Sequence, residues 1–145
     1  MLKNLNKKLS NAQVLLEPLA PKHHEELRLA CAEDQEIWDI YPNSMLGEHF
    51  DKAIADMSKG QDRAVFAVIK IDALRLQKVV GMTSYINPDQ QGVVEIGGTY
   101  ISPEVRGTGF NLTMKRLLIE HSFACGYRRI EFRVDVRNKR SQKAV

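Results

Sequence analysis

Apolar residues in the first part of the chain recur mainly at helical spacing. A short apolar run at 13–17 predicts a first strand, and Pro21 can then occupy the first turn of a helix that continues to residue 32. A second helix is predicted over 47–59, where apolar residues recur every three or four positions. His23 and His24 point in different directions on the first helix, so they are poor partners for one metal ion and we expect both to be solvated.

The second part of the chain has the patterns of a β-sheet. Four segments have β-branched or alternating apolar residues that predict strands: 64–71, 79–86, 93–101 and 130–137. The turn-forming residues 87–92 predict a hairpin, whereas the run 112–125 predicts a helix. A strand, a helix and a strand of these lengths require a crossover, so the last two strands are predicted to be parallel neighbours. The predicted fold is α/β (α+β), with a mixed, mostly antiparallel sheet and flanking helices.

Composition restricts the class of protein further. A chain of 145 residues with 43% hydrophobic and 27% charged residues is typical of one soluble domain. A net charge of +3 favours an anionic cofactor but does not call for nucleic acid, and no apolar run has membrane-spanning length. Cys31 and Cys125 lack metal-type spacing, which favours a reduced, cytoplasmic protein without a metal. We expect the basic segment 1–12 to be a flexible leader and 13–145 to be one domain.

A glycine-rich turn between the third of these strands and the helix after it is the most informative segment. Residues 106–111 are Arg-Gly-Thr-Gly-Phe-Asn. Glycines allow the backbone to approach a ligand closely, and the helix N-terminus adds partial positive charge, so such a turn can bind phosphate. The turn lacks the third glycine of G-x-G-x-x-G, and no Gly-Lys-Ser/Thr occurs in the chain. An ordinary strand-to-helix turn explains the hexapeptide alone equally well.

Several motifs together resemble a known family. The turn 106–111 is similar to the pyrophosphate loop R-x-x-G-x-[GA] of the GNAT acetyltransferases, with Asn111 in the place of the final small residue. The strand before it carries Glu-Ile-Gly and leads into Ile-Ser-Pro within 95–103, and the next strand ends in Asn-x-x-Ser at 138–141. This combination resembles the ribosomal-protein N-acetyltransferase branch of the family. The resemblance implies a GNAT fold over 13–145.

The resemblance also implies an activity and a set of site residues. It implies that an acetyl group moves from acetyl-CoA directly to a primary amine, either a protein N-terminus or a small molecule. In the family, the pantetheine arm pairs where two parallel strands splay after a bulge, which places the Ile101 N–H at the thioester oxygen. Ser141 would lie near the thioester sulfur, although a solvated residue fits there too, and a helix N-cap fits Asn138. The residues implied to bind the cofactor are Ile101, Arg106, Gly107, Thr108, Gly109, Phe110, Asn111 and Asn138.

Transfer to an amine requires the neutral amine. An α-amine, with a pKa near 8, loses its proton far more readily than a lysine with a pKa near 10.4, so one carboxylate acting through water can suffice. Glu95 is the candidate base, because it lies on the strand that leads into the site. A surface or salt-bridged glutamate fits the same position nearly as well.

The chain departs from the family pattern at its end. Many members have a tyrosine seven residues after the asparagine, where this chain has Val145, so Ser141 or water would have to protonate the departing thiolate. The family also continues beyond this point through a helix and two strands, so the chain looks truncated. We expect the open edge of the strand 130–137 to pair with another copy in a homo-oligomer such as a dimer. The alternative function is an inactive CoA-binding or interaction protein.

Overall fold

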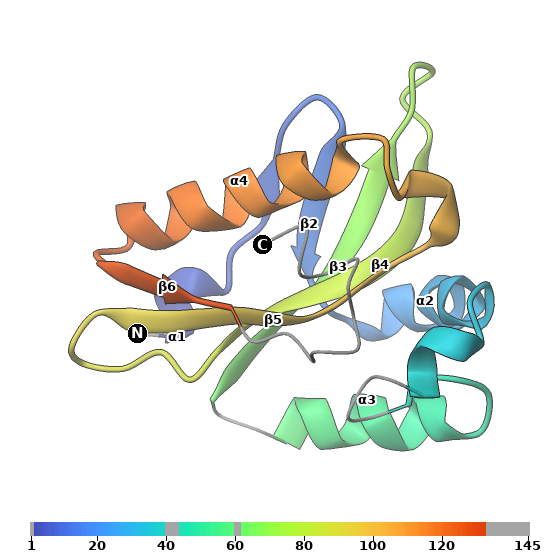
Figure 1. Ribbon diagram of the computed structural model, residues 1–145, viewed down its shortest axis with the longest axis horizontal. Coiled ribbons are helices and arrows are strands. Elements are labelled where there is room, and N and C mark those ends of the chain that lie inside the picture. The colour runs from blue at the N-terminus through green and yellow to red at the C-terminus, as the bar shows by residue number, and fades with distance from the viewer. Residues whose placement is uncertain (1, 40–43, 60–61, 133–145) are drawn as a thin grey trace.

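The computed structural model of the chain describes residues 2–39, 44–59 and 62–132 (Figure 1). The helices, with the short 3₁₀ turns labelled η, are α1 (Leu2–Leu5), η1 (Pro21–His23), α2 (His24–Ala32), η2 (Glu36–Asp39), α3 (His49–Lys59), η3 (Pro103–Val105) and α4 (Phe110–Ala124). The strands are β1 (Leu9–Ser10), β2 (Val14–Pro18), β3 (Arg63–Ile71), β4 (Gln77–Ile86), β5 (Val93–Ile101) and β6 (Arg129–Glu131). No helix among these residues has the length and apolar character needed to span a bilayer.

The described strands form one sheet in the order of the sequence. Strands β1 to β5 pair antiparallel with their neighbours, and β6 pairs parallel with β5 after the crossover through α4. The predicted mixed, mostly antiparallel sheet with a parallel pair around the glycine loop is therefore confirmed.

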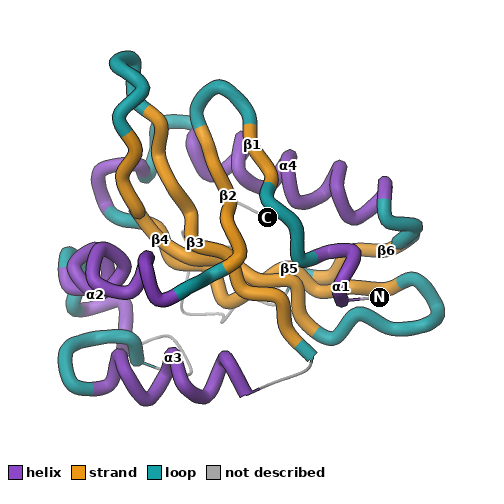
Figure 2. The backbone as a smooth tube through the Cα atoms, turned by 180° about the vertical axis from the view of Figure 1, so that it is seen from behind, coloured by secondary structure: helices purple, strands orange, loops and turns teal. Residues whose placement is uncertain are grey.

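Helices cover the two faces of this sheet. Helix α4 lies on one face and helices α2 and α3 lie on the other, as the views from opposite sides show (Figures 1 and 2). Alternate strand residues divide between the two cores accordingly. Phe66 and Tyr85 pack with Leu118 on the α4 side, whereas Met82 and Tyr100 pack against the α2 and α3 side.

The N-terminal segment differs from the expected flexible leader. Residues 2–5 form α1, and β1 pairs with β2. Leu5 is fully buried in the core on the α4 side, and its carbonyl oxygen lies 3.1 Å from Nε2 of His121. Burial of one leucine fixes this polar segment against the domain, because an apolar side chain removed from water stabilises the ordered chain.

The prediction of two solvated histidines is wrong for His23. Its side chain is only 4% exposed. Nδ1 accepts a hydrogen bond from the Ala20 N–H at 3.0 Å, so the proton is on Nε2, which donates to Oε1 of Glu17 at 2.9 Å. His23 thus joins the end of β2 to the start of α2. Its neighbour His24 is half-buried.

Candidate active site

A β-bulge interrupts β5 in its middle. Gly98 and Thr99 together stand opposite the single residue Thr83 of β4, and the two threonine hydroxyls lie 2.9 Å apart. Gly98 has a φ of 60°, which glycine adopts without the steric cost of a Cβ. Because the bulge adds one residue, Gly97 and Tyr100 face the same side of the sheet, the side of α2 and α3.

The parallel pairing of β5 with β6 is short in the part of the chain described. It joins 93–95 to 129–131, while β5 itself continues to Ile101. The predicted splaying of the two strands would begin here, but the chain after Phe132 lies outside the described residues. Asn138 and Ser141 fall in that part, so their predicted roles stay predictions.

The glycine loop presents backbone donors at the start of α4. Gly107 and Gly109 have φ values of 74° and 85°, and a Cβ added to either would have no neighbour within 4 Å. Within the described residues, the N–H groups of Gly107, Thr108 and Gly109 have no hydrogen-bond partner. Phe110 buries its side chain in the core, and Asn111 is half-buried in the first turn of the helix. Unbonded donors at the N-terminus of a 15-residue helix favour an anion.

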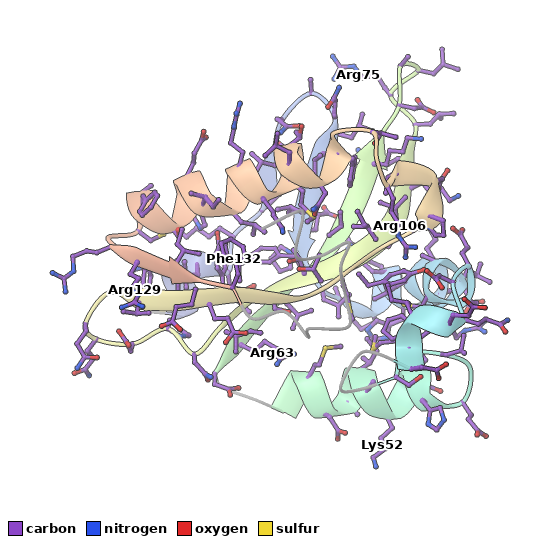
Figure 3. The ribbon with its side chains drawn as sticks, in the orientation of Figure 1. Lys52, Arg63, Arg75, Arg106, Arg129 and Phe132 are labelled. Carbon is purple, nitrogen blue, oxygen red and sulfur yellow. The ribbon has the colours of Figure 1, made fainter. Side chains whose placement is uncertain are left out.

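Arg106 connects this loop to two other parts of the protein (Figure 3). Its Nε donates to the Ile101 carbonyl oxygen at 2.9 Å, and Nη1 donates to Oδ2 of Asp34 at 2.6 Å. The guanidinium also lies 5.6 Å from the ring centre of Tyr100. The backbone N–H of Arg106 bonds to Pro103 at 3.2 Å, so the loop's open donors begin one residue later. The side chain of Arg106 therefore positions the loop relative to β5 and the segment after α2.

Two aromatic residues tie the end of α2 to β5. The Tyr100 hydroxyl donates to the Ala30 carbonyl at 2.6 Å, and the indole N–H of Trp38 donates to the Cys31 carbonyl at 2.9 Å. The two rings are stacked with their centres 4.9 Å apart. The last carbonyls of a helix lack partners within it, so these bonds complete the C-terminus of α2. Burial raises the pKa of the Cys31 thiol to about 12.

The candidate base Glu95 lies on the side of the sheet that faces α2 and α3. It stands in register with Ile86 of β4 and with Glu131 of β6. Its Oε2 lies 3.0 Å from the position that a Cβ on Gly97 would occupy. The missing side chain at Gly97 therefore makes the room that the carboxylate fills.

Two further residues that the sequence analysis missed lie beside Gly98, the residue after Gly97. A Cβ added to Gly98 would lie 3.5 Å from Nη1 of Arg63 and 3.5 Å from Oγ of Ser84. Arg63 begins β3 and Ser84 lies in β4, so both fit ordinary strand positions in the sequence. Only the pairing of β3, β4 and β5 brings them to the bulge.

The predicted site residues that the structure describes therefore gather in two places. Ile101 and the loop 106–111 lie at the end of β5 and the start of α4, and Glu95 lies on β5 just before the bulge. Among the described residues, no three His, Cys, Asp or Glu side chains come together in a group that could hold a metal ion.

Comparison with known proteins identifies the class to which this fold and site belong. Residues 13–145 match the family model described as an acetyltransferase (GNAT) domain. The match covers most of the chain, so the chain belongs to the GNAT acetyltransferase family, as the motifs predict. No curated protein matches its sequence significantly.

Solved structures of acetyltransferases share the fold. A probable GNAT-family acetyltransferase from Chromobacterium violaceum superposes with a TM-score of 0.84 at 29% identity, over 96% of this chain and 71% of that one. A GCN5-related N-acetyltransferase from Brucella melitensis gives 0.80 at 26% identity, over 95% and 66% of the two chains. The spermidine N-acetyltransferase from Vibrio cholerae, solved with CoA and spermine, gives 0.66 at 18% identity, over 92% and 78%. At that identity the last likeness shows the fold alone.

Proposed function

We propose that this chain is an N-acetyltransferase that moves acetyl from acetyl-CoA directly to a primary amine, within a complex of both substrates. The observation that carries the proposal is the row of unbonded N–H groups at 107–109, placed where the bulged strand β5 leads into α4. Acetyl-CoA, when bound, supplies an activated thioester carbonyl and a thiol leaving group. Membership of the GNAT family supports this assignment.

The loop residues suit a pyrophosphate. Three consecutive N–H donors, two glycines without neighbouring side chains and the partial positive charge of α4 would all stabilise negative charge there. Phe110 would fix the helix start through the core, and Asn111 would add a polar side chain in the first turn. Arg106 would hold the loop in place through Ile101 and Asp34.

The end of β5 can supply a donor to the thioester oxygen. The N–H of Ser102 bonds to the Val80 carbonyl at 2.7 Å, toward β4. Successive N–H groups of a strand point to opposite sides, so the N–H of Ile101 points away from β4. A preorganised donor on that side would stabilise the negative charge that develops on the oxygen as the amine attacks.

Glu95 would accept the proton of the amine through a water molecule. The neutral amine nitrogen forms the new C–N bond while the C–S bond breaks, and the sulfur leaves with its electron pair. The proton displaced from nitrogen passes through water to Glu95, and Ser141 or water would protonate the departing sulfur. We propose a protein N-terminus or a small-molecule amine as the acceptor, in line with the ribosomal-protein branch that the motifs resemble. The polyamine named for the Vibrio cholerae structure is a further amine to test.

Titration calorimetry of acetyl-CoA tests the cofactor site. Gly109→Trp places a bulky side chain at a φ of 85° in the loop, while Gly126→Trp makes the same change at a φ of 96° at the other end of α4. A Cβ at either glycine meets no neighbour within 4 Å, so the two variants are matched. We expect binding heat from the parent and from Gly126→Trp, and none from Gly109→Trp. No heat from the parent, or equal heat from both variants, would contradict the proposal.

Turnover separates the enzyme from the alternative, an inactive protein that binds CoA or a partner. CoA release over a panel of amines would support the enzyme, whereas cofactor binding without turnover of any amine would favour the alternative.

We also propose a cytoplasmic homo-oligomer that associates through the edge of β6. Two free cysteines support a reducing compartment. A monodisperse monomer in light scattering would contradict the oligomer.

A further inference from the structure

We infer that the acceptor carries an anionic group close to its amine, and that Arg63 and Ser84 recognise this group. The inference deepens the proposed function and rests on it. The arrangement of polar groups around the bulge in β5, on the side of the sheet that faces α2 and α3, supports the inference. Neither Arg63 nor Ser84 belongs to the motifs by which the family was predicted.

Two consecutive glycines contribute no side chains to the layer over this part of the sheet. Gly97 and Gly98 lie in the interior of β5, yet Gly98 is exposed. The Glu95 carboxylate lies over Gly97, and the Arg63 guanidinium and the Ser84 hydroxyl lie beside Gly98. The two glycines are therefore bordered by one carboxylate and by two kinds of hydrogen-bond donor.

The Arg63 guanidinium has no carboxylate partner among the residues that the structure describes. Its side chain is half-buried, and in the part of the chain described it forms neither an ion pair nor a hydrogen bond. Arg28 and Arg106, in contrast, are both paired with carboxylates. A guanidinium stays charged at all accessible pH values, and its planar set of donors suits carboxylate and phosphate groups. Figure 3 shows Arg63 on the side of β5 that faces α3.

Ser84 is a second, independent indication of a ligand. Its side chain is 1% exposed, and Oγ has no hydrogen-bond partner among the described residues. Buried polar groups in native proteins are nearly always bonded, so an unpaired hydroxyl needs a partner from elsewhere. A ligand anion beside Gly98 would accept hydrogen bonds from both Ser84 and Arg63.

The spacing of these groups restricts the acceptor. Successive residues of a strand lie about 3.3 Å apart, and the carboxylate contacts the Cβ position of Gly97 whereas the donors contact that of the next residue, Gly98. An amine that reaches Glu95 would then have its anionic group only a few atoms away. Amino acids and short aminoalkyl phosphates have this arrangement, whereas polyamines do not.

Competition between matched acceptors tests this inference. With acetyl-CoA in excess, mass spectrometry would follow acetylation of each L-amino acid beside its amide and its decarboxylated amine. Ethanolamine and phosphoethanolamine form the phosphate arm. We expect at least one anionic acceptor to exceed its uncharged partner by about tenfold or more in kcat/KM, as one hydrogen bond to a charged group allows. The arm in which this acceptor occurs identifies the anion as a carboxylate or a phosphate.

Variants assign the effect to Arg63. Arg63→Gln should lower kcat/KM for the anionic acceptor by about tenfold or more and leave its uncharged partner within about twofold. Arg63→Lys should recover part of the loss, because it keeps the charge, and Ser84→Ala should give a smaller loss than Arg63→Gln. Arg75→Gln, at an exposed arginine in the turn between β3 and β4, is the control and should change neither acceptor.

Three outcomes would overturn the inference. They are equal or faster acetylation of uncharged or cationic amines, an equal loss for both partners in Arg63→Gln, and failure of every anionic amine to be acetylated by protein that binds acetyl-CoA. Calorimetry of acetyl-CoA on the same samples distinguishes failure of the proposed function from failure of this inference alone. If acetyl-CoA itself does not bind, the proposed function fails and this inference fails with it.

Discussion

Replacing Arg106 by methionine tests whether the glycine loop is held by the contacts that this arginine makes. Methionine keeps much of the length and apolar character of the side chain but removes its charge and all its donors. The variant loses the bonds to Ile101 and Asp34 and the contact with the Tyr100 ring. Asp34, only 19% exposed on its side chain, then loses this cation.

The loss of stability follows from these contacts. Each hydrogen bond from a charged group contributes about 1.5–3 kcal/mol, and a cation–π contact adds about 0.5–1 kcal/mol. The side chains of Arg106 and Asp34 keep 13% and 19% of their exposure, so water can solvate part of what the substitution uncovers. We therefore expect the free energy of unfolding to fall by about 4 kcal/mol, near the low end of the sum of these contributions, which is about 3.5–7 kcal/mol.

Urea unfolding measures this change. Trp38, the single tryptophan, stacks on Tyr100 beside the arginine, so its fluorescence reports on this part of the protein. Arg28→Met is the control, because Arg28 forms an exposed ion pair with Glu25 and its loss should cost about 0.5 kcal/mol or less. A loss in Arg106→Met no larger than that of the control would refute the reasoning. Acetyl-CoA should also bind the variant more weakly, since the loop is no longer fixed to β5.

Three other experiments test separate parts of the structure. Gly81→Ala would place a Cβ 1.9 Å from the Tyr100 carbonyl oxygen, so β4 and β5 must separate. The free energy of unfolding in urea should then fall by about 3 kcal/mol or more. A fall below about 1 kcal/mol would contradict the close approach. Burial raises the pKa of Cys31 to about 12, so its side chain stays a thiol at pH 8. Iodoacetamide should therefore label Cys31 only in urea, as mass spectrometry can detect. Labelling of Cys31 in the native protein would contradict this. The hydrogen bond from His23 lowers the pKa of Glu17 below its ordinary value of 4.5. The ionised carboxylate therefore contributes to the stability of the folded protein above pH 4.5, and this contribution is lost as the pH falls through the folded pKa. Glu17→Gln should cost about 1 kcal/mol at pH 7 and flatten the acid side of the stability profile, which denaturation at several pH values would show; an unchanged acid side would contradict it.

Local patterns in the sequence were enough to predict most of the sheet, although not β1. Runs of β-branched and other apolar residues marked β3, β4 and β5 to within two residues, and short turns required them to be antiparallel neighbours. The length of the segment that contains α4 required a crossover, so the parallel pairing with β6 followed. These features depend on residues close together in the chain, which is why a single sequence contains them.

Contacts between distant segments were not predictable in this way. The burial of Leu5 depends on a core formed by later strands and by α4, and nothing in the polar residues around it indicates that core. Asp34 is 72 positions from Arg106, and the motif that contains the arginine says nothing of its partner. Arg63 and Ser84 reach Gly98 only because three strands pair in one register. The family resemblance located the loop, whereas the acceptor side required the structure.

The bulge at Gly98 and Thr99 divides β5 into two halves, and the alternation of side chains between the two faces of the sheet shifts by one residue from the first half to the second. Deleting one of these two residues would restore a regular ladder and rotate everything after it by one face. Tyr100 would then turn toward α4 and leave the Ala30 carbonyl without its donor, while Ile101 would turn toward α2. The number of residues in this strand is therefore as strongly constrained as their identity, and a deletion here should be far more damaging than most substitutions.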